Sequence, residues 1–161
     1  MTVEDIILSR DRRGISKLRE HVPDDYCDRA ARLVLDNKGT AVIATGFYIM
    51  SGGAVETDGP PGAVAIGGAL TALGYEVVYV TDRYLAAILE AVAGPDARVV
   101  DFPIVDDEAS KAFATGLLKE LDPAVLISIE RCGFSSDGIY HNMHMRDMSQ
   151  FTARVDYLFT D

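Results

Sequence analysis

Four short apolar runs rich in β-branched residues alternate with helical segments. This alternation restricts the possible fold classes more than any other feature of the sequence. The runs occupy residues 40–45, 75–81, 97–102 and 124–129. They show little polar–apolar alternation, which is typical of parallel strands covered on both faces. Helical periodicity is found in residues 61–73, 83–93 and 106–121, and a further amphipathic helix is predicted from Pro23, as a first-turn proline, to Asn37. This order predicts an α/β fold, with an open, mostly parallel sheet of about four or more strands, helices on both faces and N-terminal helices.

Length and charge restrict the remaining possibilities. We expect residues 1–161 to form a single domain. The formal net charge of −10 argues against a nucleic-acid partner, because such a surface repels phosphate backbones, but leaves a small acidic substrate open. No run reaches the ~18 apolar residues that a membrane-spanning helix needs. Cys27 and Cys132 lack metal-site spacing and no secretory signal precedes them, so we expect reduced thiols and a cytoplasmic location.

Residues 39–81 contain no Lys or Arg, which indicates a buried centre in which the carboxylates of Glu56 and Asp58 stand out. This stretch includes the first candidate binding segment, residues 46–60, which follows the first predicted strand. Ligands of an open parallel sheet bind outside the carboxyl ends of its strands, where connections usually take roughly 2–6 residues. The helix start at residues 59–62 is suited to binding a carboxylate or phosphate. The alternative is that Asp58 only caps this helix.

Gly52 and Gly53, in the middle of the first candidate segment, are expected to allow a ligand to approach the backbone closely. The second candidate segment, residues 130–142, follows the fourth predicted strand. We expect Glu130 and Arg131 to point into one crevice, where the planar guanidinium of Arg131 would bind a carboxylate. The alternative is that both residues pair with other surface charges.

Three further types of side chain are candidates for chemistry. Asp82 ends the second apolar run and is equally suited to holding a ligand hydroxyl or amino group and to capping the next helix. His141 and His144 are spaced as a metal pair, but spacing identifies no third ligand. Cys132 has no partner for nucleophilic catalysis that spacing would identify.

Several strings in the sequence resemble the C-terminal domain of the D-glutamate cyclase family. The most specific is ETDGPPGA at residues 56–63, which follows TGFYI at residues 45–49. The other matching positions are residues 4–6, 11–14, 73–77, 81–82 and 129–131, together with Asp137, Gly138, Tyr140 and Asn142. The resemblance follows the family's order over nearly the whole chain.

This resemblance implies a hydro-lyase that dehydrates D-glutamate to 5-oxo-D-proline. It also implies two sets of site residues. The catalytic set is Glu56, Asp58 and Glu130, and the substrate-binding set is Thr45, Gly46, Gly59, Gly62, Asp82, Arg131, Asp137 and Asn142.

Lactam formation requires a deprotonated α-amine and a neutralised or polarised γ-carboxyl. The helix start at Gly62 and the fork of Arg131 would hold the two substrate carboxylates. One of the three catalytic carboxylates would move the protons if burial raised its pKa. Alternatively, a divalent cation such as manganese or magnesium, bound by Glu56 and Asp58, would polarise the γ-carboxyl. The sequence does not choose between these roles.

Two departures from the family pattern open alternative functions. The family continues with a glycine-rich Gly-Asp-Gly-Gly-Asn-Glu segment, so we expect this chain to correspond to the first half of that domain. Cys132, Gly133 and Phe134 follow Arg131 where the family tends to have proline, glycine and a second arginine. The alternatives are a non-catalytic small-acid binding module that needs a partner chain, and a phosphate-binding α/β protein. Because a half-domain exposes a sheet edge or an apolar face, we expect a homo-oligomer.

Overall fold

The computed structural model describes residues 2–9, 11 and 14–160. Arg12 and Arg13, which belong to the family-like opening, lie outside the described residues. The chain forms two compact units, Met1–Lys38 and Gly39–Asp161. No helix in the described part is long and apolar enough to cross a membrane.

The N-terminal unit consists of α1 (Val3–Ile7), the 3-10 helix η1 (Ile15–His21) and α2 (Tyr26–Asp36). The buried Glu4 carboxylate links α1 to α2 by accepting a 2.9 Å hydrogen bond from the Cys27 amide. The predicted amphipathic helix is present, but it begins at Tyr26 and Pro23 lies before it, outside its first turn. The Arg19 guanidinium donates to the carbonyl of Pro23 at 3.3 Å, and this contact helps to hold the segment before α2 outside the helix.

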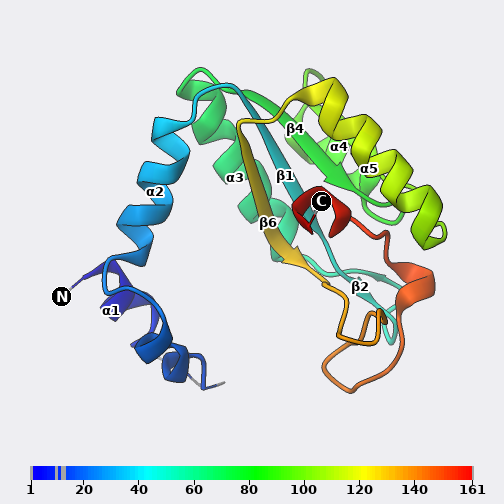
Figure 1. Cartoon of the computed structure of the whole chain (residues 1–161), viewed down its shortest axis with the longest axis horizontal. Helices are drawn as coiled ribbons and strands as arrows, with labels where there is room; N and C mark the ends of the chain where they lie inside the picture. Colours follow the sequence, from blue (N-terminus) through cyan, green and yellow to red (C-terminus); the bar gives the residue numbers. More distant parts are fainter. Residues whose placement is uncertain (1, 10, 12–13, 161) are drawn as a thin grey trace. The chain divides into compact units, whose positions relative to one another are not determined.

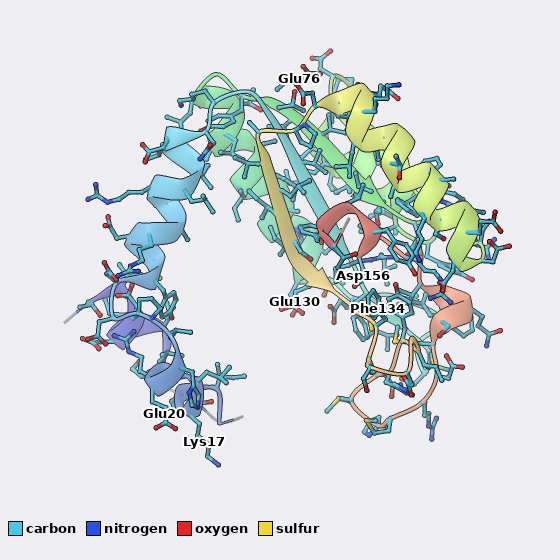
Figure 2. All side chains as sticks on the ribbon, viewed as in Figure 1. Lys17, Glu20, Glu76, Glu130, Phe134 and Asp156 are labelled. Atoms are coloured by element: carbon cyan, nitrogen blue, oxygen red, sulfur yellow. The ribbon has the colours of Figure 1, made fainter. Side chains whose placement is uncertain are left out.

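The second unit contains a parallel four-stranded sheet, which confirms the predicted α/β class. Its strands are β1 (Thr40–Gly46), β4 (Glu76–Thr81), β5 (Arg98–Asp101) and β6 (Val125–Arg131), in the order β5-β4-β1-β6. β1 is central, and Ile43 lies opposite Tyr79 of β4 and Ile127 of β6. All strands point the same way, so Glu130 at the end of β6 lies far from Glu76 at the start of β4 (Figure 2).

Helices cover both faces of this sheet, as predicted (Figure 1). α3 (Gly59–Ala72) and α4 (Ala86–Ala93) lie on one face, and α5 (Asp107–Leu121) and α6 (Tyr157–Thr160) lie on the other. On the α5 side, Val42 and Val80 pack against Leu117 in the main apolar core. On the α3 side, Gly67 lets the helix approach Tyr79 of β4, because a Cβ there would lie 1.9 Å from the tyrosine hydroxyl.

The strand order places a switch of direction beside β1. The chain moves from β1 outward through β4 to β5, and then returns to place β6 on the opposite side of β1. Ligands of such sheets bind in the crevice at the carboxyl ends of the strands where this reversal occurs. The carboxyl ends of β1 and β6 are therefore the first place to look for a site.

Two predicted segments differ from the structure. Residues 46–60 contain an antiparallel hairpin of β2 (Tyr48–Ile49) and β3 (Ala54–Val55), and the amides of Gly52 and Gly53 donate to Ile49 O in its turn. These glycines therefore serve the hairpin turn. The helix expected to start at residue 83 starts at Ala86, because residues 82–85 form a turn closed by Leu85 N donating to Asp82 O.

The tail after β6 contains the short 3-10 helix η2 (Ser149–Phe151) and two isolated bridges, one of which joins Phe134 to Tyr140. Within the described residues 132–160 no strand is formed. Cys132, Tyr140 and Met148 form a small buried cluster here. Burial raises the pKa of the Cys132 thiol, so this cysteine has the character of a packing residue.

Candidate functional site

A β-bulge at the end of β6 sets the direction of Glu130. Thr45 of β1 pairs with Ile129, but the next residue, Gly46, pairs with Arg131, so Glu130 is an extra residue in β6. Its φ is +46°, a left-handed conformation that residues other than glycine rarely adopt. Bulges often redirect a side chain beside a functional site. This one leaves the Glu130 side chain exposed at the switch point of the sheet.

The first turn of α3 packs directly against this bulge through Gly59. A Cβ at Gly59 would lie 2.8 Å from the Cβ of Glu130 and 3.0 Å from the hydroxyl oxygen of Thr45. Only a glycine permits this approach without a shift of the bulge. Thr45 is fully buried, and its Oγ1 has no hydrogen-bond partner among the described residues.

Glu56 completes the cluster from the segment between β3 and α3. Burial, the like charges of Asp58 and Glu130, and a hydrogen bond with the Glu130 side chain raise the pKa of Glu56 above its ordinary value. Its Oε1 is buried, and no donor in the described part of the chain reaches it. These causes all favour the protonated form of the Glu56 carboxyl.

Asp58 is the N-cap residue of α3, but its carboxylate makes no hydrogen bond to the helix. The interpretation of Asp58 as only a cap is therefore not supported by the contacts. The second and third residues of α3 are Pro60 and Pro61, which have no N–H group. The helix start thus offers a positive dipole end with fewer amide donors than usual, and an exposed carboxylate stands beside it.

Arg131 and Asp82 form a buried ion pair at the same end of the sheet. The distance from Arg131 Nη1 to Asp82 Oδ2 is 2.7 Å, and each side chain is only 5% exposed. Arg131 also donates from Nη1 to Gly46 O at 3.0 Å and from Nη2 to Ala153 O at 2.9 Å. The expected common crevice for Glu130 and Arg131 is not seen, because the bulge leaves Glu130 exposed while Arg131 is buried.

Comparison with known proteins shows the family of this chain. The family model described as D-glutamate cyclase-like, C-terminal, matches residues 3–161. The chain belongs to this family. Human mitochondrial D-glutamate cyclase (Homo sapiens) is 32% identical over 145 aligned positions, which cover 80% of this chain. The chain spans only 23% of the length of that relative.

Within this D-glutamate cyclase-like chain, Asp137 and Asn142 are used by the loop that carries them. Asp137 accepts a 3.0 Å hydrogen bond from the Ile139 amide, which lowers the pKa of its carboxyl, and Asn142 Oδ1 accepts from the amides of His144 and Arg146. No contact between these two side chains and the Glu56 cluster is seen in the described part. Gly62 faces β6, and a Cβ there would lie 3.9 Å from Ile129.

The predicted site residues therefore fall into three sets in the structure. Around the start of α3 lie Thr45, Glu56, Asp58, Gly59 and Glu130, and Gly62 follows on the same helix. Gly46, Asp82 and Arg131 support the strand ends from below the surface, while Asp137 and Asn142 order a separate loop.

The structure gives no support for a dedicated metal centre in this family member. Among the described residues, no three His, Cys, Asp or Glu side chains lie so that they share one metal position. His141 lies 3.4 Å from Asp137, and His144 is exposed.

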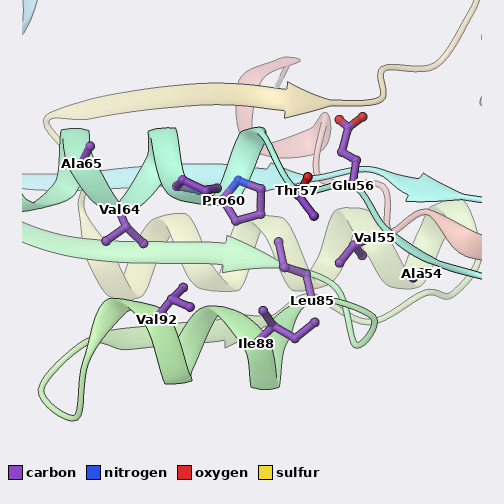
Figure 3. A pocket seen from close by; sticks show the side chains of 11 residues that line it. Ala54, Val55, Glu56, Thr57, Pro60, Val64, Ala65, Leu85, Ile88 and Val92 are labelled. Atoms are coloured by element: carbon purple, nitrogen blue, oxygen red, sulfur yellow. The ribbon is translucent and has the colours of Figure 1, made fainter.

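A cavity of about 640 Å³ lies between α3 and α4. Its walls are mainly apolar and include Val64 of α3 and Ile88 and Val92 of α4. Glu56 belongs to the segment at one end, but its carboxyl points away from the cavity and toward the end of β6 (Figure 3). Glu56 also belongs to the cavity lining, so the carboxyl cluster adjoins one end of this cavity, whose mainly apolar walls do not suit a dicarboxylate.

Two residues outside the predicted set also hold the site. The Thr81 hydroxyl donates a hydrogen bond to Thr45 O at 2.8 Å and so links the ends of β4 and β1. The carbonyl of Ala153 accepts a hydrogen bond from Arg131. Thr81 precedes Asp82 in the family-like string, so the sequence contained a signal for it. Ala153 acts through its backbone, and its side-chain type gives no such signal.

Proposed function

We propose that this chain carries a D-glutamate cyclase-like site at the carboxyl ends of β1 and β6, which converts D-glutamate to 5-oxo-D-proline and water. Family membership supports the reaction class. The observation that carries the assignment to this place is the gathering of Glu56, Asp58 and Glu130 at the start of α3, with Glu56 biased toward its neutral form.

The reaction joins the α-nitrogen of glutamate to its γ-carboxyl carbon. The ammonium first loses a proton, and the amine lone pair then forms the C–N bond. The nitrogen loses its second proton after this bond has formed. The C–O bond to one carboxyl oxygen breaks, and that oxygen leaves as water with two protons, equal in number to those lost by the nitrogen. The site must therefore accept protons at nitrogen and deliver protons at oxygen. Groups with opposite protonation states at the same pH are needed.

Glu56 is assigned as the acid, because burial and the neighbouring carboxylates raise its pKa and so favour the form that can donate a proton to the departing oxygen. Glu130 is assigned as the base, since it is exposed at the bulge beside Glu56. Asp58 is assigned to binding of the substrate ammonium, since its carboxylate is exposed and not used by the helix. Arg131 is assigned to support of the site, because both of its Nη atoms are bonded within the protein.

Charge decides how this site tolerates an acidic substrate. D-Glutamate has two carboxylates and one ammonium, and three ionised protein carboxylates would repel it. Protonation of Glu56, which its raised pKa favours, removes one of these charges, and the N-terminus of α3 contributes a positive end of roughly half an elementary charge. The ammonium is then the group that the remaining carboxylates attract.

A binding module without catalysis is the second candidate. The ion pair between Arg131 and Asp82 favours this candidate. The guanidinium of Arg131 bonds to groups within the protein, so its two Nη atoms are not available to bind a substrate carboxylate. In that case the carboxylates bind the ammonium of a small acid, and a partner chain completes the site. A cytoplasmic location remains part of the proposal.

The test is an assay of the purified chain with D-glutamate and, separately, L-glutamate, each with added manganese or magnesium and with chelator. Chiral chromatography and mass spectrometry would detect 5-oxoproline, and calorimetry would detect binding. Product from D-glutamate supports the lyase. Binding without product supports the binding module, and the absence of both contradicts both proposals.

A further inference from the structure

We propose that Arg131 is a positioning residue whose guanidinium holds the β6 bulge, so that Glu130 stays beside Glu56 and the first turn of α3. This inference rests on the proposed function for its catalytic consequence. Its structural part, the dependence of the Glu56–Glu130 contact on Arg131, can be tested separately.

The bulge needs support because its central residue is strained. Glu130 has a φ of +46°, and its side chain gains no ion pair in the described structure in return for this conformation. Non-glycine residues hold such conformations only where the surrounding structure enforces them, and these positions cluster at functional sites. The enforcing contacts must come from neighbouring residues.

Arg131, the next residue, supplies these contacts to three separate parts of the unit. It reaches Asp82 after β4 at 2.7 Å, the Gly46 carbonyl of β1 at 3.0 Å and the Ala153 carbonyl of the tail at 2.9 Å. Asp82 is itself held, since it accepts a hydrogen bond from the Tyr84 amide at 3.3 Å. A guanidinium has fixed donor directions, so contacts to three elements fix the backbone that carries it.

The space around Gly46 shows how closely the end of β1 packs against Arg131 and its neighbours. Its φ is +115°, and a Cβ there would lie 2.9 Å from the Thr81 hydroxyl, 3.0 Å from Leu85 and 3.4 Å from Arg131 Nη1. The end of β1 is therefore packed against the guanidinium on one side. On the other side the register changes between Thr45 and Gly46, which makes Glu130 the extra residue.

Glu130 and Arg131, which are consecutive in the sequence, therefore have different roles. Arg131 is buried and bonded, whereas Glu130 is exposed beside Glu56, with its Cβ against Gly59. If Arg131 loses its three contacts, the bulge relaxes and the Glu130 carboxyl moves away from Glu56. The competing role for Arg131 is direct binding of a substrate carboxylate through Nε, which is buried without a partner in the described part.

The experiment compares Arg131→Lys with Arg98→Lys in the full chain. Arg98 pairs with Glu120 in an exposed ion pair at the start of β5, so it is a matched substitution away from the bulge. Carboxyl carbon-13 NMR would follow the titration of Glu56 without substrate, and turnover of D-glutamate would give kcat and KM. Circular dichroism would establish that each variant is folded.

We expect Arg131→Lys to move the Glu56 titration toward the ordinary glutamate range and to lower kcat by roughly 10²-fold with little change in KM. Arg98→Lys should change neither. A folded Arg131→Lys with an unchanged Glu56 titration would overturn the proposal, and a raised KM in that variant would identify Arg131 as a substrate contact. If the wild-type chain does not turn over D-glutamate, the proposed function fails while the titration still decides the positioning role.

Two further comparisons apply if Arg131→Lys does not fold. Asp82→Asn keeps the shape of the ion pair and removes its charge, and the same shift of Glu56 is expected. Independently, Glu130→Gly should melt at a higher temperature than Glu130→Ala, because glycine tolerates a positive φ. Equal melting temperatures would show that residue 130 is not held in the strained conformation, which overturns the proposal.

Discussion

Glu56 is the residue of the carboxyl cluster whose pKa is shifted by burial and by its neighbours. Its carboxyl is partly withdrawn from water and faces two other carboxylates, those of Asp58 and Glu130. An ionised Glu56 is therefore less favourable in the folded chain than in the unfolded chain. Such a residue is retained at a cost in stability, which is typical of functional groups with shifted pKa values.

The pH dependence of stability follows from this shift. Folding raises the pKa of Glu56 above 4.5, so the native state binds its proton more tightly than the unfolded state does. Its unfavourable effect is absent below that value, grows as the pH rises toward the folded pKa and is complete above it. Glu56→Gln should therefore melt at a higher temperature than wild type at about pH 8, with the difference vanishing near about pH 4. A lower melting temperature for the variant at the higher pH would contradict this account.

At the residue scale, the sequence singled out the acidic residues of the candidate site but did not predict their geometry. Glu56 and Asp58 stood out because residues 39–81 contain no basic residue. The left-handed conformation of Glu130 and the unpartnered hydroxyl of Thr45 arise from a register shift between β1 and β6. These strands are far apart in the sequence, so no local pattern predicts how their ends meet.

At the scale of elements, α3 contacts both the sheet and the carboxyl cluster. Its first turn packs on the β6 bulge, and its middle packs on β4 through Gly67. The helix is rich in glycine and small residues, which cost helix propensity but permit close packing. The two functions of α3, packing and presentation of the site, depend on different glycines.

A pair of glycine substitutions separates these effects. Gly68→Ala, where a Cβ has nothing within 4 Å, should stabilise the protein by about 1 kcal/mol through helix propensity. Gly59→Ala should instead destabilise it by about 1–3 kcal/mol, because its Cβ would overlap Glu130 and Thr45. Urea denaturation of both variants would measure the difference. A stabilising Gly59→Ala would show that the approach of α3 to the bulge is not as close as described.

The main elements could be predicted because their signals are local. All four strands were expected from apolar runs, and α5 was expected from its first-turn acids, with Asp106 capping it. The hairpin of β2 and β3 was missed because strands of two residues leave no periodic pattern. The start of α4 was predicted too early because Asp82 takes part in a turn that precedes the helix. The ion pair of Asp82 with Arg131 on β6 stabilises this turn.

At the scale of the whole molecule, the apolar core belongs to one of the two units. Every buried apolar residue identified in the described chain lies between Ala41 and Leu158. The sheet has two edge strands, β5 and β6, and the cavity wall of α4 exposes Ile88 and Val92 by half or more. Exposed edges and apolar surface of this kind favour association.

We therefore expect the chain to form a homo-oligomer. Sedimentation velocity across micromolar concentrations should show a species heavier than the 17.4 kDa chain, with a weight-average mass that rises with concentration. Replacement of Ile88 by Glu should weaken that association if the α4 surface takes part. A single monomeric species at every concentration would contradict the expectation.

The carboxyl cluster as the catalytic site is the central claim, and one comparison of variants tests it most directly. D-Glutamate turnover would be measured for wild type, Glu56→Gln and Glu76→Gln, the last being an exposed glutamate at the opposite end of the sheet (Figure 2). We predict that Glu56→Gln lowers kcat by roughly 10²-fold or more, the usual contribution of a general acid, while Glu76→Gln keeps the wild-type rate. A Glu56→Gln variant that forms 5-oxoproline as fast as wild type would contradict the account.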